Sequence, residues 1–163
     1  MTSLKFCGYE DKYRDSSPAA QNDSKILSVC GVGSFRVEAE FSKGLLHRIE
    51  LKDATTIAPF GTAITYHFTG PAPDSMRVDA DGNLYVAMYS QGRVLVFNSH
   101  GMPIGQILLP GRDRGHNMRS TSMALRPGTD DLFIVTNDWD GGEGSWIFHS
   151  KAFGKALPLF SHQ

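Results

Sequence analysis

The sequence predicts an all-β protein, a partial β-propeller of about two and a half four-stranded blades, and two observations support this class. The stretch from Gly70 to Pro110 contains four short strand-like runs joined by tight turns, which is the antiparallel meander of a propeller blade. A similar pattern recurs along the chain, where Gly92 follows Gly44 by 48 residues. A period of this length is typical of propeller arrays.

Turn-forming residues divide this central stretch into its strands. Residues 81–83 form an Asp-Gly-Asn turn that tolerates left-handed backbone, and Gln91–Gly92 and residues 99–101 provide two further turns. No apolar stripe with helical spacing runs past two turns, so strands are expected rather than helices. The expected strands are residues 76–79, 84–89, 93–97 and 104–109.

Related units flank the central one. An incomplete blade is expected before it, ending near Ala63, and a further blade is expected after it, ending near Gln163. A closed propeller has about four to eight blades, so three units predict part of a larger propeller or a truncated product. The expected flanking strands are residues 37–41, 45–51, 122–125, 132–135 and 144–149.

The segments between the strands differ in character. Residues 1–25 are polar and turn-forming with no clear period, and we expect a poorly ordered lead-in there. A single propeller domain is expected over residues 26–163. Residues 111–121 and 138–144 are expected to be polar loops, the first between blades and the second rich in carboxylates and glycine.

Composition excludes several classes of protein. The formal net charge is −1 and the 16 Lys and Arg residues are dispersed, so no nucleic-acid partner is expected. No apolar run approaches the roughly 20 residues that span a bilayer, and the N-terminus lacks the apolar core of a secretory signal. Cys7 and Cys30 could form one disulfide, but they are not spaced like metal ligands and the sequence offers them no catalytic partner. A reduced, cytoplasmic location is therefore expected.

Residue spacing argues against three alternative sites. An EF-hand loop beginning at Asp79 would need Glu at its twelfth position, where Ser90 stands, so a hairpin with Asp79 and Asp81 facing solvent is expected. In a loop that begins at Asp138 the twelfth position is His149 and not Glu, so a solvated loop is favoured over a cation site. The third alternative, a Ser/His hydrolase using His116 and one of the serines in residues 120–122, lacks any G-x-S-x-G motif.

Four segments carry a resemblance to a known family, namely Pro73–Asp79, residues 81–87, Gly92–Phe97 and Pro103–Ile107. In these residues the chain resembles the SMP-30/gluconolactonase/LRE family, closest to its Drp35-type lactonase branch, over about residues 41–148. The resemblance implies the C-terminal half of a six-bladed propeller that binds a divalent cation, usually Ca²⁺, in its central channel. It also implies hydrolysis of a small-molecule lactone.

The same resemblance implies site residues. The Asp of the family's PD[GS]M motif is a metal ligand and the proposed proton donor, and it falls on Asp74; the following ligand falls on Ser75. Two other family ligands, an Asn from the preceding blade and a Glu near the start of the full-length protein, have no counterpart in this chain. Ca²⁺ prefers six to eight oxygen ligands, so Asp74 and Ser75 alone would form an incomplete site.

Other polar residues could border the mouth of the channel. His116, Arg119 and Thr121 lie in the expected inter-blade loop and are candidate substrate contacts, with a plain polar loop as the alternative. Two functions are thus predicted: a Ca²⁺-dependent lactone hydrolase, in truncated form, or a non-catalytic propeller fragment or inactive paralogue acting as a binding module. Self-association through exposed blade faces is also expected, since an open propeller exposes apolar faces that a closed ring buries.

Overall fold

The structure is a computed structural model that describes residues 26–32, 35–40, 43–53, 56–70, 73–139, 141–142 and 144–158. The expected lead-in at residues 1–25 lies outside these ranges. Within them the chain forms strands and one short 3₁₀ helix, η1 at Arg112–Arg114, and no helix is long and apolar enough to cross a bilayer.

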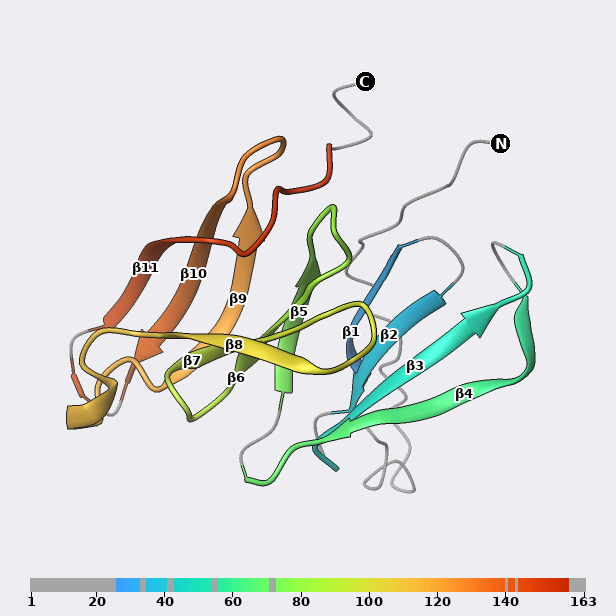
Figure 1. Cartoon of the computed structure of the whole chain (residues 1–163). Helices are drawn as coiled ribbons and strands as arrows, with labels where there is room; N and C mark the ends of the chain where they lie inside the picture. The colour runs from blue at the N-terminus through green and yellow to red at the C-terminus, as the bar shows by residue number, and fades with distance from the viewer. Residues whose placement is uncertain are drawn as a thin grey trace, which may run out of the picture.

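The strands form three antiparallel sheets in chain order (Figure 1). The first sheet has the order β1-β2-β3-β4, the second β5-β6-β7-β8 and the third β9-β10-β11. This succession of meanders confirms the predicted partial β-propeller. The strands are β1 Ile26–Val32, β2 Phe35–Glu40, β3 Leu45–Leu51, β4 Ile57–His67, β5 Pro73–Val78, β6 Leu84–Met88, β7 Arg93–Phe97, β8 Pro103–Leu108, β9 Arg119–Leu125, β10 Asp131–Asp138 and β11 Gly144–Lys151.

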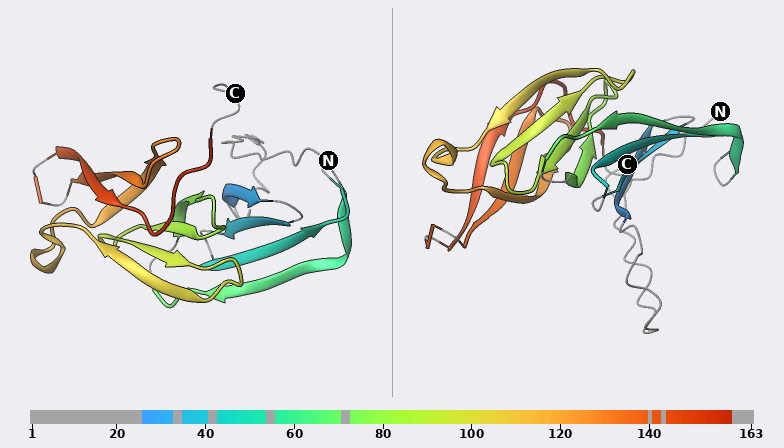
Figure 2. Two further views of the ribbon diagram at one scale, coloured as in Figure 1. Left: turned by 45° about the horizontal axis from the view of Figure 1, so that its top comes forward. Right: turned by 90° about the horizontal axis from the view of Figure 1, so that it is seen from below.

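The first strand of each sheet lies next to the first strand of the following sheet. Strand β5 contacts both β1 and β9, so the three starting strands stand side by side in the middle of the molecule (Figures 1 and 2). The later strands of each sheet extend outward from this group. This is the arrangement of blades around the channel of a propeller, with β1, β5 and β9 as the innermost strands.

A glycine in left-handed conformation precedes or begins the third strand of every sheet, which explains the recurring glycine in the sequence. Gly44, Gly92 and Gly144 have φ values of 62°, 58° and 83°. A side chain is strained in this region of backbone space, so the turn favours glycine. The carbonyl groups of Gly44 and Gly92 also accept hydrogen bonds from the backbone just beyond the fourth strand, from Phe68 (2.8 Å) and Leu109 (2.9 Å).

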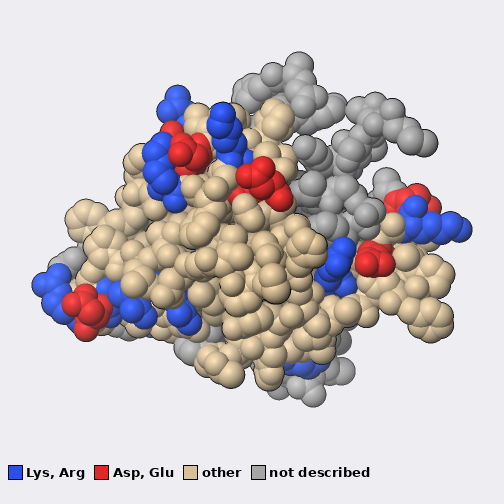
Figure 3. Space-filling model, in the orientation of Figure 1, with Lys and Arg blue, Asp and Glu red and all other residues tan. Residues whose placement is uncertain are grey.

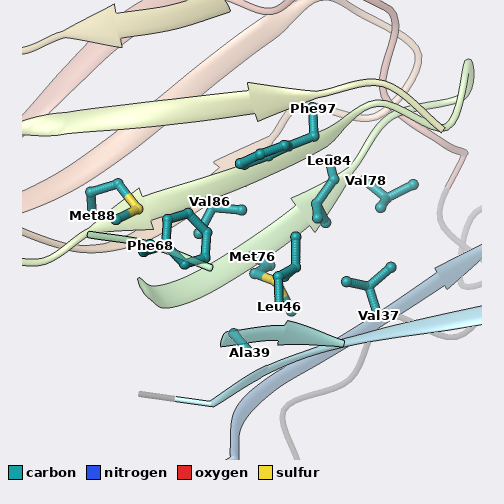
Figure 4. Packing of buried hydrophobic residues seen from close by; sticks show 10 residues of the cluster. All are labelled: Val37, Ala39, Leu46, Phe68, Met76, Val78, Leu84, Val86, Met88 and Phe97. Carbon is teal, nitrogen blue, oxygen red and sulfur yellow. The ribbon is translucent and has the colours of Figure 1, made fainter. Parts of the chain in front are cut away.

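The inner part of the second sheet is buried on both faces because it packs between the other two sheets, whereas its outer strand β8 is largely exposed. Its central strand β6 is buried along its whole length. Successive side chains of a strand point to opposite faces, and here Val86 joins the cluster with the first sheet while Ala87 joins the cluster with the third. Figure 4 shows the first of these clusters, made by residues 37, 39, 46, 68, 76, 78, 84, 86, 88 and 97.

The third sheet is apolar on both faces but buried on only one. In β10, Leu132 and Ile134 pack against the second sheet, whereas Phe133 and Val135 are each 37% exposed on the opposite face. Ile147 of β11 pairs with Val135 and is 69% exposed. The exposed face made by Phe133, Val135 and Ile147 is where a further blade would pack in a closed propeller.

The structure corrects several details of the predicted blades. The first sheet is complete, because residues 57–67 form a full fourth strand, and the incomplete sheet among the described residues is the third. Strand β5 begins at Pro73, three residues before the expected start. Strand β9 begins at Arg119, so Arg119 and Thr121 are strand residues and not part of a loop.

The turn at residues 79–83 is confirmed, but the expected exposure of Asp79 is wrong. Asp79 is 0% exposed, whereas Asp81 is exposed as predicted. Burial follows from the C-terminal segment, in which Ala156 forms a bridge with Asp79 and the Lys155 carbonyl accepts a hydrogen bond from Ala80 (2.7 Å).

Charged side chains lie in small groups of mixed sign on the face shown in Figure 3, with a broad uncharged area between them. No basic stripe of the kind that tracks a phosphate backbone crosses this face.

Candidate functional site

The candidate site begins at a β-bulge in the innermost strand of the second sheet. Pro73 pairs with Met88 and Met76 pairs with Val86, so β5 holds one more residue than β6 between these two pairs. Asp74 and Ser75 occupy this irregular stretch. A bulge bends a strand and redirects its side chains, and bulges are frequent next to active sites. The sequence-predicted ligands therefore lie together on the strand that lines the channel.

Within the described part of the chain, the half-buried Asp74 carboxylate and the buried Ser75 hydroxyl have no partner that compensates for their burial. Burial raises the pKa of Asp74 from 3.8 to about 6, and no cation or hydrogen bond among the described residues lowers it. The Ser75 hydroxyl oxygen is buried and has no hydrogen-bond partner in the described part of the chain. Buried polar groups of native proteins are normally satisfied, so this pair fits a site that a cation completes.

The pair by itself does not fill a coordination shell. Among the described residues, no group of three or more His, Cys, Asp or Glu side chains is placed to hold a metal ion. A Ca²⁺ ion takes six to eight oxygen ligands, and Asp74 and Ser75 can supply two or three of them. The other ligands would come from water, backbone carbonyl groups, neutral side-chain oxygens or residues outside the described ranges.

Three strands meet at the end of β5 where Asp74 lies. Pro73 pairs with Met88 at the end of β6, and the hydroxyl of Ser120 in β9 is 2.9 Å from the Met88 carbonyl oxygen. The Ser120 hydroxyl also lies 3.1 Å from the carbonyl oxygen of Arg93. Ser120 is 0% exposed, and its contacts with backbone carbonyls make it a structural link between blades.

Thr121 occupies the position in β9 that corresponds to the bulge of β5. Ser120 pairs with Thr136 and Ser122 pairs with Val135, which leaves Thr121 as the additional residue. Strands β5 and β9 lie side by side, so the two bulges lie at the same end of neighbouring innermost strands. Thr121 therefore lies in a bulge of the innermost strand that neighbours the strand of Asp74, and its role as a substrate contact stays a prediction.

Arg119 lies at the same end of β9 and meets an aromatic ring that the sequence did not single out. Its guanidinium carbon is 5.8 Å from the centroid of the Tyr89 ring, within the range of a cation–π interaction. Tyr89 directly follows Met88 in the turn between β6 and β7. The sequence signal for this contact was an aromatic residue next to a tight Ser-Gln-Gly turn. The sequence alone does not show which cationic side chain packs against that ring.

His116 is held in a different environment from Asp74. Its Nδ1 atom donates a hydrogen bond of 2.8 Å to Oδ2 of Asp138, whose other oxygen accepts one from the Asn117 backbone N–H (2.8 Å). Gly141 lies so close to this pair that a Cβ atom there would collide with both side chains. Asp138 is 2% exposed, so the expectation that it belongs to a solvated loop is wrong.

A shallow pocket of about 210 Å³ lies beside His116, between the connection that follows β8 and the third sheet. Trp146 and Phe148 of β11 form its apolar wall, and Arg114 of η1 lies at its margin. Strand β11 is two strands outward from β9 in the third sheet. His116 therefore lies in the connection just before β9, beside the end of β10, and not on an innermost strand with Asp74 and Thr121.

The chain is similar to known proteins over most of the strands described above. A family model described as the SMP-30/Gluconolactonase/LRE-like region matches residues 38–138. Lactonase drp35 of Staphylococcus saprophyticus subsp. saprophyticus is 59% identical over 118 residues, which cover 71% of this chain and 36% of that protein. Lactonase drp35 of Staphylococcus aureus strain USA300 is 49% identical over 147 residues, which cover 89% of this chain and 43% of that protein.

A solved structure supports the fold. The crystal structure of a calcium-binding protein, regucalcin from Agrobacterium tumefaciens, superposes with a TM-score of 0.58 at 21% identity, over 78% of this chain and 46% of that one. The chain thus spans between 36% and 43% of the length of the two curated relatives. Because the family model covers most of the described strands, the predicted resemblance is confirmed: this chain belongs to the SMP-30/gluconolactonase/LRE-like family.

Proposed function

We propose that this chain carries part of the metal site of a lactone hydrolase, with Asp74 and Ser75 as oxygen ligands of a divalent cation, Ca²⁺ by preference. One observation carries the proposal: a half-buried carboxylate and a buried hydroxyl adjoin in the bulge of an innermost strand, and the described residues leave both without a compensating partner. The curated relatives are lactonases by name, which supports the reaction, and the similar regucalcin is a calcium-binding protein, which supports the metal.

The proposed chemistry assigns Asp74 two roles. As a ligand it supplies a hard anionic oxygen, and Ser75 supplies a neutral one, which suits Ca²⁺ better than a soft metal. As a proton carrier it accepts a proton from the water that attacks the lactone carbonyl carbon. It then returns the proton to the ring oxygen as the C–O bond of the ring breaks. When bound, the cation would polarise the carbonyl group of the lactone.

The second proposed function is a non-catalytic propeller fragment or inactive paralogue that acts as a binding module. The observation that favours it is the small number of ligands, since the described residues include no group of three or more acidic, His or Cys side chains placed to hold a metal ion. The chain matches less than half of its curated relatives, so a complete site in this lineage would draw ligands from sequence beyond these residues. We propose that a truncated form binds Ca²⁺ weakly.

The test combines metal binding with hydrolysis. Calorimetric titration of the chain with CaCl₂ is expected to give a dissociation constant of about 1 mM or higher, as for Ca²⁺ sites with few protein oxygen ligands. Asp74→Asn keeps the shape of the side chain but removes its charge, and it should abolish this binding. It should also lower the hydrolysis of γ-butyrolactone by about 100-fold or more if the unmodified chain hydrolyses it. Ser75→Ala should weaken binding to a smaller extent.

Asp81→Asn is the matched control, because Asp81 is an exposed carboxylate at the other end of the same hairpin. It should change neither binding nor hydrolysis. Calcium binding that survives in the Asp74 variant would disprove the proposed site. If the unmodified chain binds Ca²⁺ through Asp74 but opens no lactone at saturating Ca²⁺, the binding-module function replaces the hydrolase.

A further inference from the structure

The first and third sheets stand at opposite ends of the molecule, with the second sheet between them (Figures 1 and 2). Each of these end sheets therefore turns one face away from the second sheet. Equivalent positions of neighbouring blades are 48 residues apart in β2, β6 and β10. Each outward face can thus be compared with the equivalent face inside the molecule.

The outward face of the third sheet repeats a face that the second sheet buries. Phe133 and Val135 of β10 follow Tyr85 and Ala87 of β6 by 48 residues. Tyr85 and Ala87 are 0% exposed, because the third sheet covers them, whereas Phe133 and Val135 are each 37% exposed. The end of the molecule at the third sheet therefore exposes apolar side chains at positions that a neighbouring blade normally covers.

Strand β11 extends this exposed face. Ile147 pairs with Val135 in the same way that Val94 pairs with Ala87 in the second sheet. Val94 is 0% exposed, whereas Ile147 is 69% exposed. The outward side chains of two adjacent strands, which we call the β10–β11 patch, thus form one apolar surface. The patch consists of Phe133, Val135 and Ile147.

Polar side chains at both ends of the patch already have partners within the chain. At one end the Nζ atom of Lys151 lies 2.8 Å from Oδ1 of Asp131. At the other end the Nδ2 atom of Asn137 donates a hydrogen bond of 3.3 Å to Oγ of Ser145. A surface that covers the patch would bury apolar groups at its centre and leave paired polar groups at its rim, which is the usual composition of a protein interface.

The outward face of the first sheet differs from the patch. Val37 and Ala39 of β2 face the second sheet, and the residues that alternate with them occupy positions on the opposite face. These positions are equivalent to three buried apolar residues of β6 but hold charged residues. The apolar residues of β6 are Leu84, Val86 and Met88, and the charged residues of β2 are Arg36, Glu38 and Glu40.

We infer that the β10–β11 patch packs against the same patch of a second copy of this chain, in a dimer with two-fold symmetry. A two-fold contact uses one surface twice and closes after two copies. A head-to-tail contact would instead place the patch against the first sheet and bury the charged positions of β2 beside apolar groups, which is costly. The interface does not include Asp74, so the inference does not rest on the proposed hydrolase.

The experiment places opposite charges in the patch. Val135 lies in the central strand of the third sheet, so its side chain belongs to the face and not to the edge of the sheet. Val135→Lys and Val135→Asp should each weaken dimerisation by about 100-fold, because every dimer would bury two like charges. A 1:1 mixture of the two variants should recover the dimer, since mixed dimers place Lys against Asp. Sedimentation equilibrium at micromolar concentrations measures all three samples.

Ile104→Lys is the matched control, because Ile104 is an exposed isoleucine on β8, the outer strand of the second sheet. This variant and Asp74→Asn should dimerise like the unmodified chain, and circular dichroism checks that every variant folds. A monomeric unmodified chain, or assemblies that grow beyond two copies, would overturn the inference. So would a mixture that stays monomeric, which would indicate a head-to-tail contact. Dimers that persist in both Val135 variants would indicate pairing through the edge strand β11 and would also overturn it.

Discussion

The phenol group of Tyr85 donates a hydrogen bond of 2.8 Å to Oδ2 of Asp79, and both residues are 0% exposed. The same phenol oxygen accepts a hydrogen bond from the backbone N–H of Phe153 (2.7 Å). Asp79 also accepts hydrogen bonds from the N–H groups of Asp81 and Asn83 and from the Asn83 side chain. The pair therefore joins the β5–β6 hairpin to the C-terminal segment.

Tyr85→Phe is expected to lower the free energy of unfolding by about 1–3 kcal/mol, because the Phe153 N–H loses its acceptor and Asp79 loses a donor inside the protein. Urea unfolding followed by circular dichroism measures this difference. Tyr66→Phe is the control: Tyr66 packs edge-on against Phe68 and Phe97, so its ring contributes and its hydroxyl should matter little. Equal stabilities of the two variants would contradict the role given to the phenol group.

Asp79→Asn should destabilise the fold by more than Asp81→Asn, although the sequence predicted that both side chains face solvent. Both carboxylate oxygens of Asp79 accept hydrogen bonds from donors, and the amide of Asn would turn its own N–H₂ group toward one set of them. The expected loss is about 1–3 kcal/mol for Asp79→Asn, against less than about 0.5 kcal/mol for the exposed Asp81. Denaturant midpoints that coincide for both variants would show that Asp79 is not a structural carboxylate.

The stability contributed by Asp131 should depend on pH. Hydrogen bonds from Lys151 (2.8 Å) and His149 (3.0 Å) lower the pKa of Asp131 from 3.8 to about 2. A carboxyl group whose pKa is lower in the folded state stabilises the fold above its unfolded pKa and loses that contribution as pH falls through its folded pKa. Asp131→Asn should therefore reduce stability at about pH 5, with the difference shrinking between about pH 4 and pH 2. Asp113→Asn, an exposed carboxylate of η1, should show no such trend.

We propose that the chain self-associates through the exposed face of the third sheet, where Phe133, Val135 and Ile147 lie on neighbouring strands. Burial of such a face is favourable, and β11 is also an open edge of its sheet in the described part of the chain. Ile147→Lys places a charge on this face and should shift sedimentation at micromolar concentration toward the monomer. His100→Lys introduces a lysine in an exposed turn and should not. A compact monomer of the unmodified chain would refute the proposal.

Much of the fold follows from local patterns. A two-residue alternation of apolar side chains, together with turns that demand left-handed backbone, specifies strands and their ends without reference to distant residues. Gly44, Gly92 and Gly144 illustrate this, because each turn needs positive φ and each glycine marks the start of a third strand. The family resemblance at residues 73–79 likewise rests on consecutive residues.

Local sequence patterns did not show which polar side chains are buried. Asp79 is buried because Tyr85 covers it together with Phe153, which lies 68 residues beyond Tyr85 in the chain. Asp138 is buried because His116 and Asn117 fold onto it from 22 and 21 residues away. Those contacts have no signature in neighbouring residues, since an Asp in a turn is equally compatible with solvent.

The same distinction between local patterns and distant contacts applies to the candidate site. The sequence by itself determined the blade repeat and the order of the strands, whereas Asp74 and Ser75 became candidate ligands through the family resemblance of the residues around them. Only the tertiary structure decided that these two residues share a bulge in which the described residues provide no compensating partner, and that Thr121 occupies the matching bulge. It also decided that Arg119 meets Tyr89 and that His116 does not lie on an innermost strand. The bulges arise from strand pairing within each blade and the Arg119–Tyr89 contact from packing of one blade against the next, so all of them depend on residues that are distant in the sequence.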